Sequence, residues 1–594
     1  MFKKTIHLFF VIFLLVFQLG CNKYSDSDID CTTYEEPDNP NPISTESWNQ
    51  VSRGLHASIG STDERYAKYS VPNVELGKIW QGAGWQGERV SAQIVLWAVD
   101  SVARLIPEFS DFISSDGEIM LAKIAKARFV RYVITDEFAD GCGYRKPEDF
   151  AASLSADVLD TVRCFCMEAQ TTRPVWITFD IPANAKPGNY ESILKFSAKG
   201  EKTQEFEFHI EVLPQTLPPP VKWKFHLDLW QNPFAVARVY GVELWSEGHW
   251  KALKPVMTML ADAGQKVITA SINKRPWGGQ TKDPFDSMIG WTKMADGTWF
   301  YDFSVFDRWV EFMMDLGIRG QINCYTMVPW GNKVYYFDSL KNEEVEIEIV
   351  PGTKEYEEIW TPFLKTFYSH LQKKGWDKIT RIAMDERAPK EMKAMLNLLE
   401  REAPELSVAL ADNHKSYKLY PDQLKDLCVS FGSTIDEEDL EYRNSKGYIS
   451  TFYTSCSHGF PNIFTFSPPA EAHFIGWYVK AAGFDGYLRW AYCSWVQDPL
   501  HDSRFRAWPA GDTYFVYPGP RSSIRFERLR EGIQDAEKIR ILRDQLNMQN
   551  DANAQNKLQM LNQVVSQFDI LERPDNFEEI LSDARKIINE LSRK

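Results

Sequence analysis

The sequence predicts a mixed α/β protein: an N-terminal antiparallel β-sandwich, a (β/α)8 TIM-like barrel and a C-terminal helical segment. Three observations support this prediction. Residues 46–216 carry the alternating apolar and polar pattern of strands, residues 221–523 alternate strand-like and helix-like patterns, and residues 524–594 are helical throughout. A length of 594 residues accommodates two or three domains of ordinary size.

The first residues have the character of a targeting segment. Lys3 and Lys4 precede an apolar run, Ile6 to Leu19, that is short for a transmembrane helix. We therefore expect residues 1–20 to be a secretory signal. Cys21 follows the run directly, as in a bacterial lipoprotein signal, although Gln18 stands where that motif usually has an aliphatic residue.

Lipid attached to Cys21 is expected to hold the protein in the cell envelope, in the periplasm or on the outer-membrane surface. The lipid anchor is then its sole membrane attachment. Residues 21–45 are polar, acidic and rich in proline, so we expect them to form a flexible stalk. The other eight cysteines lack the CxxC spacing of a metal site, so no metal is expected, and their pairing is left open.

Residues 46–216 contain several strand patterns separated by turn signals. A proline-rich linker, with Pro214 and then Pro218 to Pro220, ends this region. Strands joined by short polar turns favour an antiparallel sandwich. The expected strands are Val90–Val99, Phe129–Ile134, Pro174–Ile181, Ser192–Ala198 and Glu205–Leu213.

Eight strand patterns follow the linker, and helical patterns lie between most of them. This alternation predicts the barrel, and an open doubly wound sheet is the main alternative. Neither a GxGxxG nor a Walker motif is present, so no nucleotide cofactor is expected. The expected strands are Lys224–Trp230, Lys266–Ser271, Gly320–Tyr325, Ile379–Asp385, Ser407–Asp412, Asp426–Phe431, Tyr448–Tyr453 and Gly486–Trp490. The expected helices are Trp250–Ala263, Phe303–Leu316, Tyr356–Lys374, Lys390–Glu402 and Ala470–Ala482.

The fourth barrel strand ends in two adjacent carboxylates, Asp385 and Glu386, and Pro389 begins the next helix. Active sites of parallel α/β barrels form where strands end and loops begin. Side chains alternate along a strand, but Glu386 falls where the strand gives way to the loop, so both carboxylates can reach one pocket. The structural alternative is an acidic helix N-terminus favoured by the helix dipole.

Other strand ends carry polar and aromatic residues that would gather at the same barrel face. Each one alone is more often a packing residue, so the argument rests on their common location. The candidates for substrate binding from these strand ends are Asn232, Asn323, Tyr325, Tyr453, Trp490 and Trp495.

Composition narrows the class of partner. A net charge of −15 argues against nucleic acid or an anionic polymer as the main partner. The chain has 20 Trp and 24 Tyr, and aromatic faces suit the apolar C–H faces of sugar rings. Large cores also contain many aromatic residues, and the position of several Trp near predicted strand ends favours the carbohydrate interpretation.

The C-terminal half carries long motifs that resemble the catalytic domain of glycoside hydrolase family 123. These motifs are Gly486–Tyr492, Asp502–Thr513, Tyr517–Pro520 and Ser523–Glu527. The strand end Met384–Arg387 is similar to the acidic pair of that family, and a sandwich followed by a barrel matches its architecture.

The resemblance implies an exo-acting β-N-acetylgalactosaminidase whose partner is a glycan with a terminal β-linked N-acetylgalactosamine. Such enzymes retain configuration by substrate-assisted catalysis through an oxazolinium intermediate. Asp385 would orient the 2-acetamido group, and Glu386 would act as general acid and base. The motifs also make Arg504 and Asp512 candidate substrate contacts. Tyr325 and Tyr453 are both candidates for the donor to the acetamido oxygen.

Physical reasoning agrees with this mechanism. Ordinary retaining glycosidases hold two carboxyls about 5–5.5 Å apart on either side of the scissile bond. Consecutive residues are better placed to serve two neighbouring atoms on one side, and two crowded carboxylates raise one pKa. Two alternatives remain open. One is a conventional glycosidase in which Asp228, Asp412 or Asp512 partners Glu386, and the other is a non-catalytic surface lipoprotein that binds glycans.

Overall fold

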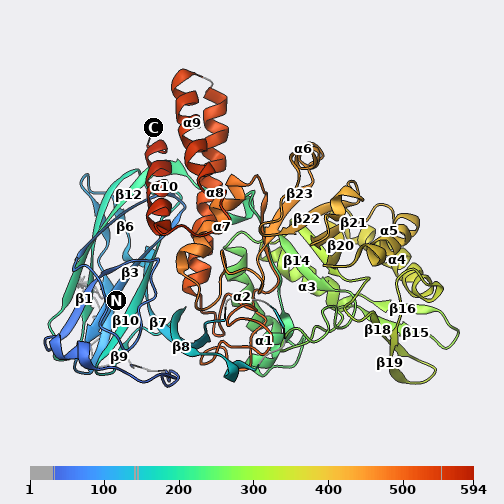
Figure 1. Cartoon of the computed structure of the whole chain (residues 1–594), viewed down its shortest axis with the longest axis horizontal. Helices are drawn as coiled ribbons and strands as arrows, with labels where there is room; N and C mark the ends of the chain where they lie inside the picture. Colours follow the sequence, from blue (N-terminus) through green and yellow to red (C-terminus); the bar gives the residue numbers. More distant parts are fainter. Residues whose placement is uncertain (1–30, 32–33, 139–141, 144–145, 550, 594) are drawn as a thin grey trace, which may run out of the picture.

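The computed structural model describes residues 31, 34–138, 142–143, 146–549 and 551–593. It is a mixed α/β fold in which N-terminal β-sheets lie beside a nearly closed barrel, and helices of the C-terminal part stand between the two (Figure 1). The predicted signal segment and Cys21 lie outside the described residues. Among the described residues, no helix combines the length and hydropathy that a membrane-spanning segment needs.

The N-terminal region consists of two sheets that pack face to face over a core of Phe, Ile, Leu and Val side chains. The prediction of an antiparallel sandwich is confirmed in part, because one pair, β2 with β12, is parallel. The first sheet has the order β1 (Leu55–Gly60), β3 (Arg89–Ala98), β10 (Thr171–Asp180), β7 (Ala125–Asp136) and β8 (Ala152–Leu159). The second has the order β2 (Ile79–Gln86), β12 (Gln204–Thr216), β11 (Gly188–Ser197), β4 (Val102–Phe109) and β9 (Phe165–Met167), with β5 (Phe112–Ser114) and β6 (Ile119–Met120) at its side.

The prediction of a flexible stalk is wrong at Cys31 and Glu36, two stalk residues that are fixed to the sandwich. Cys31 forms a disulfide with Cys164. Glu36 lies buried on the sandwich, where Arg173 donates two hydrogen bonds of 2.6 and 2.8 Å to its carboxylate and the Lys68 ammonium lies 2.9 Å away. An acidic residue that finds two buried cations is ordered despite its polar surroundings in sequence.

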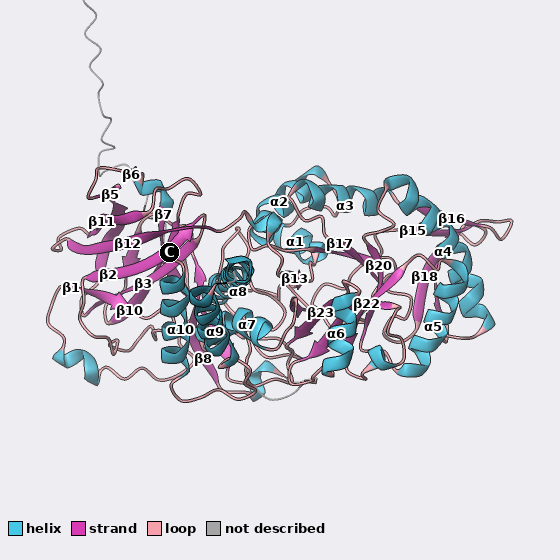
Figure 2. Ribbon diagram, turned by 90° about the horizontal axis from the view of Figure 1, so that it is seen from above, coloured by secondary structure: helices cyan, strands magenta, loops and turns pink. Residues whose placement is uncertain are grey.

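The barrel consists of eight parallel strands in sequence order, each within two residues of its predicted start and end. Helices lie on the outside of the barrel, as the view in Figure 2 shows. The strands are β13 (His226–Leu229), β14 (Val267–Ser271), β17 (Gln321–Tyr325), β20 (Thr380–Asp385), β21 (Ser407–Asp412), β22 (Leu424–Ser430), β23 (Ile449–Tyr453) and β24 (Gly486–Arg489).

Side chains, more than backbone, join β13 to β14 and close the circle. The backbone supplies only one bridge there, beside Leu227 and Gln265. The Gln265 amide accepts from the Leu229 N–H at 3.0 Å and donates to the Val267 carbonyl at 2.7 Å. Gln231 accepts from the Thr269 N–H at 2.9 Å and donates to the Leu229 carbonyl. Two glutamine amides therefore take the place of missing ladder bonds.

The five predicted helices are present, and α1 and α6 occur in addition. Only a short 3-10 turn, Ser416–Lys418, lies between β21 and β22, where the short polar connection with Pro421 cannot supply a helix. The helices are α1 (Pro233–Tyr240), α2 (Glu247–Ala261), α3 (Ser304–Asp315), α4 (Lys354–Lys374), α5 (Pro389–Glu402), α6 (Glu437–Ser445) and α7 (Pro469–Ala481). A small sheet of β15 (Gly290–Lys293), β16 (Trp299–Asp302), β18 (Lys333–Asp338) and β19 (Glu343–Glu348) extends from two of the loops.

The C-terminal helices are α8 (Ile524–Gln549), α9 (Ala552–Ser566) and α10 (Phe577–Leu591). α8 packs on α7 so closely that a Cβ on Gly476 would lie 1.9 Å from the Gly532 carbonyl oxygen. Glu537 of α8 accepts hydrogen bonds from the backbone N–H groups of residues 224 and 225, at the start of the barrel. α8 thus belongs to the barrel wall as well as to the helical end.

Candidate active site

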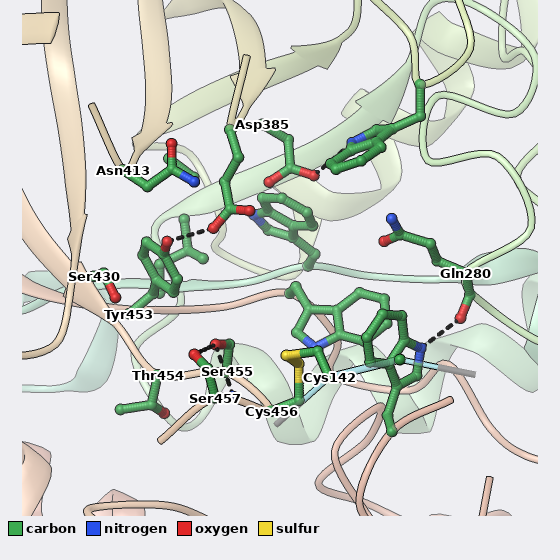
Figure 3. A pocket seen from close by; sticks show the side chains of 18 residues that line it. Cys142, Gln280, Asp385, Asn413, Ser430, Tyr453, Thr454, Ser455, Cys456 and Ser457 are labelled. Atoms are coloured by element: carbon green, nitrogen blue, oxygen red, sulfur yellow. Dashed lines mark hydrogen bonds between the residues drawn. A yellow bond between two sulfur atoms is a disulfide. The ribbon is translucent and has the colours of Figure 1, made fainter. Parts of the chain in front are cut away.

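A cavity of about 590 Å³ lies at the carboxyl ends of the barrel strands (Figure 3). Its lining comes from the carboxyl ends of the eight barrel strands and the loops that follow them, together with a loop of the sandwich. Such a position is where parallel barrels carry their active sites. The lining residues are Cys142, Gly143, Trp230, Gln280, Trp330, Asp385, Glu386, Ala411, Asn413, Ser430, Tyr453, Thr454, Ser455, Cys456, Ser457, Leu488, Trp490 and Trp508.

Asp385 and Glu386 both line this cavity, and Figure 3 shows the Asp385 carboxylate facing it. Asp385 is the last residue of β20. Glu386 has a φ of +47°, a left-handed conformation that is uncommon for residues other than glycine. Its N–H donates to the Ala411 carbonyl at 2.9 Å, which holds the turn against β21. This turn breaks the alternation of the strand, so two consecutive side chains face the same space.

The environment of Asp385 favours a proton on the acidic pair at neutral pH. Burial of the carboxyl, and then the negative charge of Glu386 beside it, raise the pKa of Asp385 to about 7. The indole Nε1–H of Trp330 donates to Asp385 Oδ2 at 3.1 Å, and this hydrogen bond lowers the pKa of Asp385. The guanidinium of Arg387 lies 4.0 Å from the centre of the Trp330 ring and holds that ring in place.

Tyr453 binds the second carboxylate. Its hydroxyl donates to Glu386 Oε1 at 2.5 Å, and this bond is drawn in Figure 3. Burial and the charge of Glu386 raise the pKa of Tyr453 far above its usual value, so the hydroxyl keeps its proton. Glu386 is therefore held by a permanent hydrogen-bond donor.

Four indole rings, Trp230, Trp330, Trp490 and Trp508, form much of the cavity wall. The rings of Trp490 and Trp508 meet edge to face at 5.5 Å. Trp490 donates to Asp512 at 2.9 Å, and Trp508 donates to the Gln280 carbonyl at 2.9 Å. Because their N–H groups are fixed elsewhere, these two rings present rigid apolar surface to a ligand.

A group of hydroxyls and one disulfide form the opposite rim. Ser430 is hydrogen-bonded to His458 Nε2 at 3.0 Å, while His458 Nδ1 accepts from the Ser455 N–H at 3.0 Å. Burial and the charge of Arg489 lower the pKa of His458, so it is neutral and donates through Nε2. The Cys142–Cys456 disulfide attaches a loop of the sandwich to this rim.

Four of the predicted site residues, Asp385, Glu386, Tyr453 and Trp490, line the cavity; the rest lie outside it. Asn232 caps α1, where its side chain accepts from two N–H groups at 3.1 and 3.2 Å. Asn323 points into the barrel interior and donates to Asp228 at 3.3 Å.

The other four predicted residues that lie outside the cavity also have structural roles. Tyr325 is 2% exposed and packs between Trp230 and Trp277, with ring centres 4.6 and 4.8 Å away. Trp495 is fully buried and donates to the Val516 carbonyl at 2.6 Å. Arg504 pairs with Asp502 at 2.7 Å. Asp512 is buried, where it accepts from Arg489 and Trp490.

Sequence reasoning missed several lining residues. Asn413 and Ser430 stand at the ends of predicted strands, so the rule applied to other strand ends would have found them. Trp508 lies inside one of the quoted motifs. Trp330 and Gln280 sit in long loops whose course no pattern predicts. Neither spacing nor composition indicated the disulfide that brings Cys142 to the rim.

The carboxylates proposed as alternative partners for Glu386 do not line the cavity. Asp228 lies in the barrel interior beside Asn323. Asp412 accepts from the backbone N–H groups of His414 and Ser416, at 2.9 and 2.6 Å. Asp512 is ion-paired to Arg489. Each is committed to a structural hydrogen bond.

Comparisons with known proteins agree with this architecture. The family profile "Glycoside hydrolase 123, catalytic domain" matches residues 230–542, and "Glycoside hydrolase 123 N-terminal domain" matches residues 59–198. No curated protein matches the chain.

Among solved structures, a family 123 glycoside hydrolase from Clostridium perfringens, described in a study of glycolipid glycan hydrolysis, is 29% identical. The match covers 91% of this chain and 97% of that one, with a TM-score of 0.82. A Bacteroides ovatus GH5 xyloglucanase is 10% identical over 80% of this chain and all of its own, but its TM-score of 0.28 is too low to support an inference. The catalytic profile spans more than half of the chain, and the resemblance seen in sequence is confirmed: the chain belongs to glycoside hydrolase family 123 and is a glycoside hydrolase.

Proposed function

We propose that this glycoside hydrolase removes terminal β-linked N-acetylgalactosamine with retention of configuration, and that the substrate's own 2-acetamido group is the nucleophile. One observation carries the proposal. Among the described residues that line the cavity, the carboxylates are Asp385 and Glu386, which are consecutive in the chain. The hydrolysis of glycolipid glycans by the Clostridium perfringens relative supports a glycan carried on lipid as the substrate.

Consecutive carboxylates suit a substrate that supplies its own nucleophile. A conventional retaining site needs one carboxyl on each side of the anomeric carbon, about 5–5.5 Å apart. Asp385 and Glu386 instead serve two neighbouring atoms on one side, namely the acetamido nitrogen and the glycosidic oxygen. Asp228, Asp412 and Asp512, the alternative partners, are hydrogen-bonded away from the cavity.

The first step forms a bond from the acetamido oxygen to the anomeric carbon as the glycosidic C–O bond breaks. Glu386 gives its proton to the leaving oxygen. Ionised Asp385 accepts the acetamido N–H and stabilises the positive charge that develops on the oxazolinium ring. In the second step a water oxygen attacks the anomeric carbon, and the bond from that carbon to the acetamido oxygen breaks, which opens the oxazolinium ring. The water proton passes to Glu386.

The acidic pair can supply both required protonation states. In the free protein the pKa of Asp385 is about 7, so the two carboxyls retain a proton near neutral pH. An amide N–H that donates to Asp385 favours the ionised form of Asp385. The substrate thereby brings the site to the arrangement that the first step requires.

Tyr453 is better placed than Tyr325 to contact the acetamido group, because it lines the cavity and Tyr325 does not. In the empty site the Tyr453 hydroxyl is bound to Glu386 Oε1. A substrate acetamido oxygen would compete with Glu386 for this donor and would free the carboxyl to carry its proton.

We further propose that lipid on Cys21 holds the enzyme in the cell envelope.

A product assay tests the proposal. The enzyme is given the 4-nitrophenyl β-glycosides of N-acetylgalactosamine, N-acetylglucosamine and galactose, and the first released anomer is identified by NMR. We expect hydrolysis of the N-acetylgalactosaminide, release of the β-anomer and no hydrolysis of the galactoside. Equal rates on galactoside and N-acetylgalactosaminide would refute substrate assistance, because galactose has no acetamido group.

A further inference from the structure

A second cleft lies between the sandwich and the barrel, and it shares no lining residue with the active site. It has a volume of about 590 Å³. Strands β3 and β7 supply one side, while α2, the start of α8 and the segment before α8 supply the other. Its lining residues are Arg89, Lys126, Arg128, Thr161, Lys251, Lys254, Pro255, Thr258, Met259, Asp262, Pro520, Ser522, Phe526, Glu527 and Arg530.

The cleft is strongly basic in a chain whose net charge is −15. Six Arg and Lys residues line it, against the two carboxylates Asp262 and Glu527. Asp180 adds a third carboxylate just outside the lining, because it pairs with Arg89. Six positive and three negative charges leave a local excess of three positive charges. Such a concentration of one sign in a concave site raises the local potential for anions.

Two of the cations already have partners. Arg89 donates to Asp180 at 2.6 and 3.1 Å and to Glu527 at 3.3 Å. The Lys126 ammonium lies 3.6 Å from Asp180. Glu527 also accepts from the Ser522 hydroxyl at 2.7 Å. The direct partners of these carboxylates are therefore Arg89, Lys126 and Ser522, while Arg128 and Arg530 feel their charges at longer range.

The other four cations have no ion pair with any described residue. Arg128 donates only to the Thr178 hydroxyl, at 3.3 Å. The Nε of Arg530 is buried without a hydrogen-bond partner. Burial, and then repulsion from Arg89, lower the pKa of Arg530 to about 10. Lys251 and Lys254 stand three residues apart on α2, which puts them on one helix face.

We propose that this interdomain cleft binds an oxyanion, namely a sulfate or phosphate group. Arginine forks match the oxygens of such groups, and a bound anion would satisfy Arg128 and Arg530 together. Because Arg128 belongs to the sandwich and Arg530 to α8, the anion would also connect the two regions. The cleft has room for a sugar ring that carries the group, so a sulfate ester on a glycan and a free phosphate ion are both chemically suitable sources.

Calorimetry on the full-length protein tests the proposal at 150 mM NaCl, with inorganic phosphate, inorganic sulfate and N-acetylgalactosamine 6-sulfate as probes. We expect saturable 1:1 binding and a rise in Tm. Arg530→Gln should abolish binding. The double variant Lys251→Gln/Lys254→Gln changes exposed side chains, so it keeps the fold, and it should weaken binding by about tenfold.

The matched control is Lys390→Gln/Lys393→Gln, which removes two exposed charges at the same spacing from α5. It should leave phosphate affinity unchanged. Tighter binding of the sugar sulfate than of inorganic sulfate identifies a glycan ester as the ligand, and equal binding identifies the free ion. Absence of saturable binding, or equal losses in the α2 and α5 double variants, would overturn the proposal.

Discussion

Replacement of Trp330 by Phe gives a quantitative test of the role of Asp385. The change removes the indole N–H that donates to Asp385 Oδ2 at 3.1 Å but keeps an aromatic ring beneath Arg387. That hydrogen bond favours the ionised carboxylate, so its loss raises the pKa of Asp385 above its value of about 7. In the proposed mechanism Asp385 acts in its ionised form, and a higher pKa leaves less of that form at every pH below it.

The size of the effect follows from the geometry. A hydrogen bond to a charged group contributes about 1.5–3 kcal/mol. Trp330 is 37% exposed, so water replaces part of the lost bond and we take roughly half of that range. About 1.4 kcal/mol corresponds to about one pKa unit. Half of that range is about 0.8–1.5 kcal/mol, so the acid limb of kcat/KM should move up from about 7 by roughly 0.5–1 pH unit, and the rate at pH 6 should fall about three- to tenfold.

The assay is the pH profile of kcat/KM on the 4-nitrophenyl N-acetylgalactosaminide. Its good leaving group needs little help from Glu386, so the acid limb reports Asp385. Trp508→Phe is the matched control, because it removes an indole N–H from the same cavity that donates to a backbone carbonyl. Its acid limb should stay in place. An unmoved limb in Trp330→Phe, or one shifted to lower pH, would refute the reasoning.

Three further predictions concern the proposed mechanism and the anchor. Glu386→Gln should lower kcat by about 10²–10⁴ on natural glycans and much less on 4-nitrophenyl substrates, and a loss independent of the leaving group would make Glu386 structural. Asp385→Asn should lower kcat greatly with little change in KM, and the variant should bind a thiazoline analogue of the intermediate more weakly. A glycosyl group found by mass spectrometry on an Asp or Glu would contradict substrate assistance. Cys21→Ser should release the folded protein from membranes into the soluble fraction, and an unmodified, fully soluble wild-type protein would contradict the anchor.

The regular part of the fold was predictable because buried parallel strands leave a strong signal. The eight strands of the barrel read as short apolar runs, and the helices between them follow a clear period. Irregular connections leave no such signal. The small sheet of β15, β16, β18 and β19 and the parallel pair β2–β12 depend on long-range pairing that no local pattern records. The sequence around Glu36 indicates a stalk because the cationic partners of Glu36, Lys68 and Arg173, are distant in sequence.

Site residues were predictable only where the position of a residue in its strand also determines the direction of its side chain. Asp385 ends β20, Glu386 adopts a left-handed conformation directly after it, and both line the cavity. Asn323 stands in the middle of β17, two residues before the strand ends, and its side chain therefore points into the barrel interior. Asn232 occupies a helix cap, a role that its residue type serves as readily as ligand binding.

The contact between the first and second barrel strands has a consequence for how this sequence can change over time. In a backbone ladder every residue type except proline supplies the same N–H and C=O, so substitutions accumulate without loss of pairing. Between β13 and β14 the amides belong to Gln231 and Gln265. Leucine at either position would leave a strand N–H of Thr269 or Leu229 without its acceptor. Closure of the barrel here depends on the side chains of Gln231 and Gln265, and we expect both residues to resist substitution even though neither lines the active-site cavity.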